Sequence, residues 1–190
     1  MKYVPRLGVL VSGRGSNLQA ILDAIKSGTL DASVEVVISD KPGVPALSRV
    51  EKSKAVVVDR AAYPSAKDFE EVIASKLERR QVGLVILAGF MRILSSAFVG
   101  RFAGRIVNIH PSLLPSFPGL RAQRQALEYG VKISGCTVHL VDESLDGGPI
   151  LAQAAVPVLP GDTEETLSER ILKEEHQLLP KVIREFARTD

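Results

Sequence analysis

In the first 110 residues, short apolar segments alternate with longer segments that show the apolar spacing of helices. The short segments are rich in β-branched residues and cover 7–11, 34–38, 55–58, 84–88 and 105–109. The helix-like segments are an amphipathic stretch from Leu18 to Ile25 that Gly28 can close, and the ranges 45–54, 66–80 and 95–102. Strands that are almost wholly apolar are typical of a parallel sheet covered on both faces. The alternation therefore predicts parallel strands joined by right-handed crossovers.

The pattern changes after Gly119. A helix is predicted over 121–129, ending at Gly130, and two strands over 135–141 and 150–158 have no helix between them. Such a pair is expected to be antiparallel and to extend the sheet. A closing helix is predicted over 163–188, capped by Asp162 or Thr163. The expected fold is a single α/β domain, a mostly parallel twisted, Rossmann-like sheet flanked by helices, with an antiparallel extension near the C-terminus.

Composition limits the partners and the compartment. With 190 residues, 45% of them hydrophobic, the chain can bury one core. Lys and Arg total 24 against 22 for Asp and Glu, interspersed, so no basic surface for nucleic acid is indicated. No segment is typical of a membrane span or a signal peptide, and the single Cys136 fits a reducing compartment. Three histidines and one cysteine without ligand spacing predict no metal site. A soluble cytoplasmic protein is expected.

The segment from Asn108 to Gly119 is the strongest candidate for chemistry. Side chains alternate along a strand, so Asn108 and His110 should project from the same face. Pro111 cannot continue the hydrogen-bonded ladder, and the prolines that follow restrict the chain to a rigid wall. In an open α/β sheet, ligands bind at the carboxyl ends of strands. The alternative is a histidine that only makes structural hydrogen bonds.

A second candidate is the glycine loop, Ser12-Gly-Arg-Gly-Ser-Asn17, between a strand and a helix. Free backbone N–H groups at a helix N-terminus suit a phosphate, and Ser16 and Asn17 can add side-chain donors. A dinucleotide fingerprint would need a glycine where Leu18 stands, and a Walker loop would need Gly-Lys-Ser/Thr. The loop thus favours a monophosphate, and a turn without a ligand is the alternative. Asp146, in Leu-Asp-Gly-Gly-Pro, is either catalytic or an ordinary turn aspartate.

Four motifs occur together and in order: Ser-Gly-Arg-Gly-Ser-Asn-Leu (12–18), Leu-Ala-Gly-Phe-Met-Arg-Ile-Leu (87–94), Asn-Ile-His-Pro-Ser-Leu-Leu-Pro (108–115) and Leu-Asp-Gly-Gly-Pro (145–149). This combination closely resembles phosphoribosylglycinamide formyltransferase, a folate-dependent family of purine synthesis, over nearly the whole chain. Asn-x-His-Pro-Ser alone is less specific, because it recurs across the formyltransferase superfamily.

The resemblance implies a role for each matching residue. Asn108, His110 and Asp146 match the catalytic trio. The pocket for 10-formyltetrahydrofolate matches Met91, Arg92, Ile93, Leu94, Asn108, Val141 and Asp142. The glycinamide ribonucleotide matches Gly13, Gly15, Ser16, Asn17, Pro111 and Glu175. It further implies one formyltransferase domain over 1–190, with a phosphate-binding half (1–100) and a folate and catalytic half (101–190). Neither a metal, a nucleic acid nor a membrane is implied, and the protein would be a monomer or a homodimer.

The implied reaction is direct attack of the glycinamide amine on the formyl carbon. Asn108 and a protonated His110 would stabilise the developing oxyanion, each such donor typically being worth about 2.7–4 kcal/mol of barrier. Asp146 would favour the imidazolium or position a water that moves protons. Two other functions remain open: the same site acting on water or another amine, and a nucleotide-binding domain without catalysis. A basic residue that often holds the folate is replaced by Ala66, with Lys67 as its neighbour. The resemblance and the crowded prolines also predict a cis Leu114–Pro115 peptide.

Overall fold

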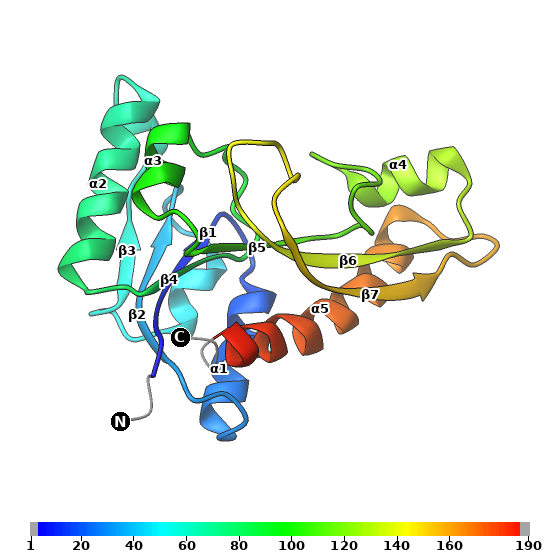
Figure 1. Cartoon of the computed structure of the whole chain (residues 1–190), viewed down its shortest axis with the longest axis horizontal. Helices are drawn as coiled ribbons and strands as arrows, with labels where there is room; N and C mark the ends of the chain where they lie inside the picture. Colours follow the sequence, from blue (N-terminus) through cyan, green and yellow to red (C-terminus); the bar gives the residue numbers. More distant parts are fainter. Residues whose placement is uncertain (1–3, 187–190) are drawn as a thin grey trace.

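The computed structural model describes residues 4–186, which form a seven-stranded sheet in the order β3-β2-β1-β4-β5-β6-β7 (Figure 1). Strands β1 to β5 pair in parallel, whereas β5 with β6 and β6 with β7 are antiparallel. The strands are Arg6–Val11, Ser33–Ser39, Ala55–Val57, Leu84–Leu87, Ile106–His110, Ile133–Leu140 and Ile150–Pro157. The predicted fold class is confirmed, including the antiparallel extension.

Helices cover the two faces of the sheet separately (Figure 1). On one face, α1 (Ser16–Lys26) and α5 (Glu164–Phe186) contribute Leu18, Ile21 and Ile171 to a buried core. On the other face, α2 (Ala66–Arg79) and α3 (Ser96–Arg101) contribute Phe69 and Phe98 to a second core. Helix α4 (Ala122–Tyr129) precedes β6. The two cores explain why β1, β4 and β5 are apolar along most of their length.

Helix α5 begins one residue later than predicted, and residues 187 and 188 of the predicted helix lie outside the described residues. The N–H of Thr166 donates to Thr163 Oγ1 (3.3 Å), so Thr163 acts as the cap. Asp162 instead forms a two-bond ion pair with Arg170 of the same helix. These contacts fix the start of the helix that closes the molecule.

The helix predicted over 45–54 is wrong in length and type. The chain forms only a 3₁₀ turn, η1 (Pro45–Arg49), and Val50 is already extended. The carbonyl of Lys54 accepts a bond from the Val37 N–H (2.8 Å), because the chain must here align with β2 before β3 begins. Sheet pairing therefore ends the helix early. A second 3₁₀ turn, η2 (Arg60–Ala62), was not predicted.

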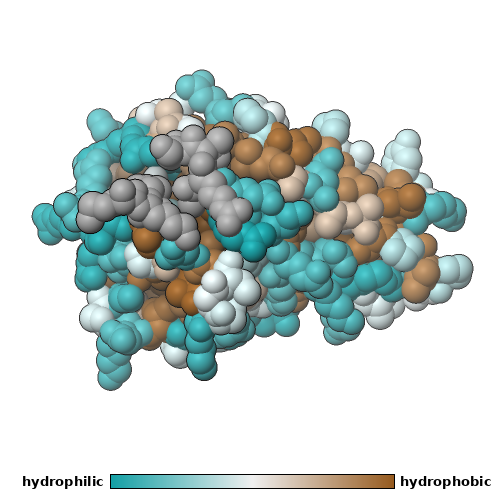
Figure 2. Space-filling view, turned by 60° about the horizontal axis from the view of Figure 1, so that its bottom comes forward, coloured by the Kyte–Doolittle hydropathy of each residue, from teal (hydrophilic) through white to brown (hydrophobic). Residues whose placement is uncertain are grey.

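The β6–β7 end of the molecule exposes apolar side chains. Ile133, Ile150, Leu151 and Leu159 are all more than one-third exposed. Figure 2 shows apolar side chains toward this end of the molecule and a second apolar group on the opposite half of the same face, with polar side chains around both. Among the described helices, none is both long and apolar enough to cross a membrane.

Candidate active site

The carboxyl ends of the parallel strands bring the sequence motifs to one edge of the sheet. Strand β1 lies beside β4, and β4 beside β5, so the glycine loop, the segment 89–94 and the Asn108–His110 pair are neighbours. Two hydrogen bonds join the first two: Ser12 N–H donates to the Gly89 carbonyl (3.1 Å), and Met91 N–H donates to Ser12 Oγ (2.9 Å). The glycine loop, expected to bind a phosphate, is thus hydrogen-bonded to the segment that the resemblance assigns to the folate.

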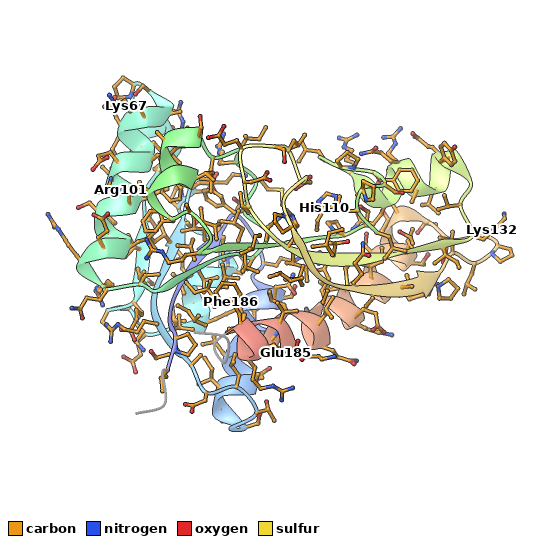
Figure 3. The ribbon with its side chains drawn as sticks, viewed as in Figure 1. Lys67, Arg101, His110, Lys132, Glu185 and Phe186 are labelled. Carbon is orange, nitrogen blue, oxygen red and sulfur yellow. The ribbon has the colours of Figure 1, made fainter. Side chains whose placement is uncertain are left out.

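His110 is buried at the end of β5 (Figure 3), and each of its ring nitrogens faces an acceptor. Its Nε2 lies 2.9 Å from the Phe117 carbonyl and its Nδ1 lies 3.4 Å from Asp146 Oδ2. A carbonyl only accepts, so Nε2 carries a hydrogen, and a hydrogen on Nδ1 as well would complete an imidazolium opposite the carboxylate. Both ring nitrogens of His110 therefore face oxygen acceptors, one a carbonyl and the other a carboxylate.

Asn108 has a partner that the sequence analysis missed. Its Nδ2 lies 3.1 Å from Nε2 of His139, which β6 places directly opposite Asn108 in the antiparallel register. The Nδ1 of His139 donates to the Leu140 carbonyl (2.9 Å), and burial lowers the pKa of His139. A neutral His139 with its hydrogen on Nδ1 must accept at Nε2. It therefore fixes one N–H of the Asn108 amide and leaves the other free.

The wall after His110 is held by a buried threonine. Thr137 Oγ1 donates to the Ser112 carbonyl (2.7 Å) and accepts from the Leu114 N–H (3.0 Å). Gln153 of β7 adds a bond to the Leu114 carbonyl (2.9 Å). The Leu114–Pro115 peptide is cis, as predicted. These contacts place the Phe117 carbonyl that His110 meets.

Asp146 reaches the site from the β6–β7 loop. Its φ is 51°, a left-handed conformation that Asp and Asn adopt more readily than most residues. Its Oδ2 also accepts the Gly119 N–H (2.8 Å). Next to it, a Cβ at Gly148 would lie 2.0 Å from the Leu140 carbonyl oxygen, so only glycine fits. Asp146 thus shapes the turn, as the second interpretation predicts, and its carboxylate also faces His110.

The glycine loop ends at an uncapped helix. Gly15 is the N-cap residue of α1, in a left-handed conformation (φ 72°) and with no side-chain cap. The first N–H groups of the helix are thus available to an anion near Gly13, Ser16 and Asn17. A Cβ at Gly15 would lie 2.6 Å from the Cβ of Ala46. Both the backbone conformation and the packing therefore require glycine here.

Asn17 and Glu175 meet across 158 residues of sequence. Asn17 Nδ2 donates to Glu175 Oε2 (2.7 Å), and both side chains are buried. Burial raises the pKa of Glu175, and the hydrogen bond from Asn17 offsets this only in part. Among residues 4–186, Asn17 Oδ1 is one of the few buried polar atoms without a hydrogen-bond partner. The pair brings two residues implied by the resemblance into direct contact between α1 and α5.

We expect Glu175→Gln to make stability less dependent on pH. The folded chain holds the Glu175 proton more tightly than the unfolded chain, because burial raises its pKa from 4.5. Stability from this group is therefore present at low pH and lost as pH rises through the folded pKa. Glutamine keeps an acceptor for Asn17 without the charge, so the variant should gain melting temperature relative to wild type as pH rises. Thermal melts from pH 4 to pH 8 would measure this, and a constant difference would contradict it.

The segment assigned to the folate is exposed where a ligand could cover it. Met91 is 57% and Ile93 81% exposed, while Leu94 packs against the second core. Arg92 pairs with the buried Asp40 (Nε to Oδ2, 2.8 Å). Across the site, Asp142 bonds the Ser144 N–H (2.8 Å), and Val141 N–H bonds the Ile106 carbonyl (2.9 Å). Lys67 lies at the outer end of α2 (Figure 3). Within residues 4–186, no hydrogen bond or ion pair joins its side chain to the segment from Met91 to Leu94.

Metal-binding residues do not gather at this site. Within residues 4–186, no group of three or more His, Cys, Asp or Glu side chains could hold a metal ion. Cys136 is fully buried, and burial raises the pKa of its thiol to about 12. It is a core residue rather than a nucleophile. The side chains that meet at this site are an amide, two histidines and a carboxylate.

Comparison with known proteins identifies the family of the chain. The formyl transferase family profile matches residues 5–183. The chain therefore belongs to the formyl transferase family, and it is an enzyme of the formyltransferase type.

Individual relatives show which members of that family the chain resembles. The chain is 44% identical to phosphoribosylglycinamide formyltransferase of Escherichia coli and 41% identical to that of Bacillus subtilis, covering 85% and 94% of those proteins. It is 50% identical to the trifunctional purine biosynthetic protein adenosine-3 of Drosophila pseudoobscura, but spans only 13% of its length. The crystal structure of glycinamide ribonucleotide transformylase 1 from Symbiobacterium toebii superposes with a TM-score of 0.97 at 52% identity, over 100% of this chain and 90% of that one.

Proposed function

We propose that the protein transfers the formyl group of 10-formyltetrahydrofolate to the amino group of 5′-phosphoribosylglycinamide, in de novo purine biosynthesis. The observation that carries this proposal is the pairing of the buried His110 with Asp146 on the same strand end as the Asn108 amide, because it is an arrangement suited to stabilising an oxyanion. The names of the relatives supply the identity of the acceptor.

The proposed mechanism is direct attack of the neutral amine on the formyl carbon. The free N–H of Asn108 donates to the oxygen that becomes negative, and the charge of His110 stabilises it further. In the structure the Nε2 hydrogen of His110 meets the Phe117 carbonyl. Donation to the formyl oxygen therefore exchanges this bond for one to the substrate, as catalytic hydrogen bonds often tighten only in the reacting complex.

The carboxylate of Asp146 keeps a compensating charge beside the imidazolium throughout the reaction. It also positions a water that carries a proton from the attacking amine to the leaving nitrogen of the folate. No covalent intermediate on the enzyme is needed in this scheme.

The two substrates are proposed to occupy the two sides of the site. Residues 1–100 supply the phosphate loop, with Gly13, Gly15, Ser16 and Asn17, and Glu175 joins it from α5. Pro111, next to His110 in the chain, is proposed to contact the nucleotide. The folate is proposed to lie between the segment Met91 to Leu94 and the loop that includes Val141 and Asp142. We propose that the enzyme works in the cytoplasm as a monomer or homodimer.

The decisive experiment mixes the purified chain with 10-formyltetrahydrofolate and glycinamide ribonucleotide and follows the folate absorbance. Turnover that requires both compounds supports the proposal. Turnover without the ribonucleotide would show water as the acceptor, and ligand binding without turnover would show a binding domain. Either result would overturn the proposed function.

His139→Phe tests the orientation of Asn108. The phenyl ring fills the space but removes the acceptor, so we expect kcat to fall by about tenfold with little change in either KM. In a chain that already carries Asn108→Leu, adding His139→Phe should cost no further kcat, because the two residues act through one amide. Kinetics of the two single variants and the double variant would check this. Fully additive losses would contradict it.

A further inference from the structure

The 3₁₀ turn η1 packs against the glycine loop. Ala46 is fully buried, and its N–H donates to the Gly13 carbonyl (3.2 Å). The Ala46 side chain fills the space that a Cβ on Gly15 would occupy, at 2.6 Å. The 3₁₀ turn that the sequence predicted as a longer helix therefore acts as the support of the loop.

One side chain of η1, Arg49, joins the two sides of Gly15. Its Nε donates to the Arg14 carbonyl (2.9 Å), and its Nη1 donates to Gln19 Oε1 (2.9 Å) on the first turn of α1. The same Nε would lie 3.4 Å from a Cβ on Gly15. The guanidinium thus lies directly against the bend of the loop.

An anion site at this bend depends on the orientation of the peptide group between Arg14 and Gly15. Glycine allows several backbone conformations, so Gly15 by itself does not fix the orientation of this peptide group. If this peptide turned over, the Arg14 carbonyl would point toward the helix N-terminus, where it would repel a phosphate. The helix has no side-chain cap that could hold the bend instead. Arg49 supplies the missing restraint, and its positive charge favours an anion at the same place.

We propose that Arg49 is a positioning residue for the phosphate of the nucleotide substrate: it holds the Arg14 carbonyl and so keeps the N–H groups of the loop turned toward the anion. This rests on the proposed function for the nucleotide and for its phosphate site. Arg49 lines an open hollow of about 380 Å³ together with Ser16, Gln19, Ala20, Asp23 and His176.

The test compares Arg49→Ala with the wild type in two measurements. Titration with inorganic phosphate, followed by ³¹P NMR, reports the anion site alone. Steady-state kinetics report each substrate separately. We expect Arg49→Ala to raise both the Kd for inorganic phosphate and the KM for glycinamide ribonucleotide by about tenfold, with kcat and the folate KM changed by less than about twofold.

Two further variants separate positioning from general effects. Arg49→Lys keeps the charge and one donor, so it should recover most of the phosphate affinity. Arg101→Ala removes the same charge and two ion pairs, with Glu71 and Glu78, from α3 on the other side of the sheet (Figure 3), and should leave both constants unchanged. Thermal melts of all variants confirm that they are folded at the assay temperature.

The outcomes are distinguishable. Equal phosphate affinity in wild type and Arg49→Ala would overturn the proposal, as would an Arg49→Lys chain as weak as Arg49→Ala or an equal rise in both substrate KM values. A wild-type chain without formyl transfer, whose phosphate affinity still falls in Arg49→Ala, would overturn the proposed function and support the role of Arg49.

Discussion

Asp146→Asn is expected to lower kcat by about 100- to 1,000-fold, comparable to the loss of one donor from an oxyanion hole, because it removes the charge that supports His110 as a donor. The change is almost isosteric. Asparagine tolerates the left-handed backbone at this position and can still accept the Gly119 N–H, so the loop should keep its shape. What it removes is the negative charge 3.4 Å from His110 Nδ1, and with it the support of the imidazolium. Both substrates should still bind, so KM should change by less than about threefold.

Steady-state kinetics on the purified Asp146→Asn variant measure the fall in kcat, and substrate titrations measure whether both substrates still bind. Glu143→Gln is the matched control, because it removes one exposed charge from the same loop without touching His110. A variant with near-normal turnover would show that Asp146 only shapes the turn. A slow variant that has also lost both substrates would show that the loop, rather than the charge, had failed.

Asn108→Leu is expected to lower kcat by a similar factor, about 100- to 1,000-fold, because it removes the neutral donor to the oxyanion. Leucine has nearly the same size, and the neighbouring residues of β5 are buried, so the strand should remain in place. The effect should fall on kcat rather than on either KM, since the bond forms mainly in the transition state.

Single-turnover measurements with saturating substrates would separate this loss from slower binding. The Nε2 of His139 would lose its partner in this variant, and thermal melts would record the resulting loss of stability. Turnover within about tenfold of wild type would show that the oxyanion is stabilised elsewhere, and His110 would then be the remaining donor.

The local patterns of the sequence were sufficient for the fold and for part of the site. The apolar strands and amphipathic helices alternate, and this alternation limits the chain to a parallel sheet with covered faces. The period of a strand is two residues, so Asn108 and His110 had to share a face wherever the strand lay. Likewise, the glycine loop between a strand and a helix had to present backbone N–H groups, because every helix begins with unpaired donors.

The error at 45–54 has the opposite origin. The sequence there permits a helix, but β3 must align with β2, and the Val37–Lys54 bond extends the chain instead. Local preference and sheet pairing conflict at this point, and pairing prevails because it satisfies backbone groups of β2 and β3.

Only the tertiary structure decided which side chains became partners. His139 faces Asn108 because β6 pairs antiparallel with β5 in one register, and no local pattern encodes a register. Glu175 meets Asn17 across the whole chain, and Arg49 reaches Arg14 because η1 packs onto a loop more than 30 residues earlier. The sequence by itself determined which residues could carry charge or donate hydrogen bonds and on which face of an element they lie. Their distances, burial and pairing came from packing, because these depend on contacts between segments that are remote along the chain.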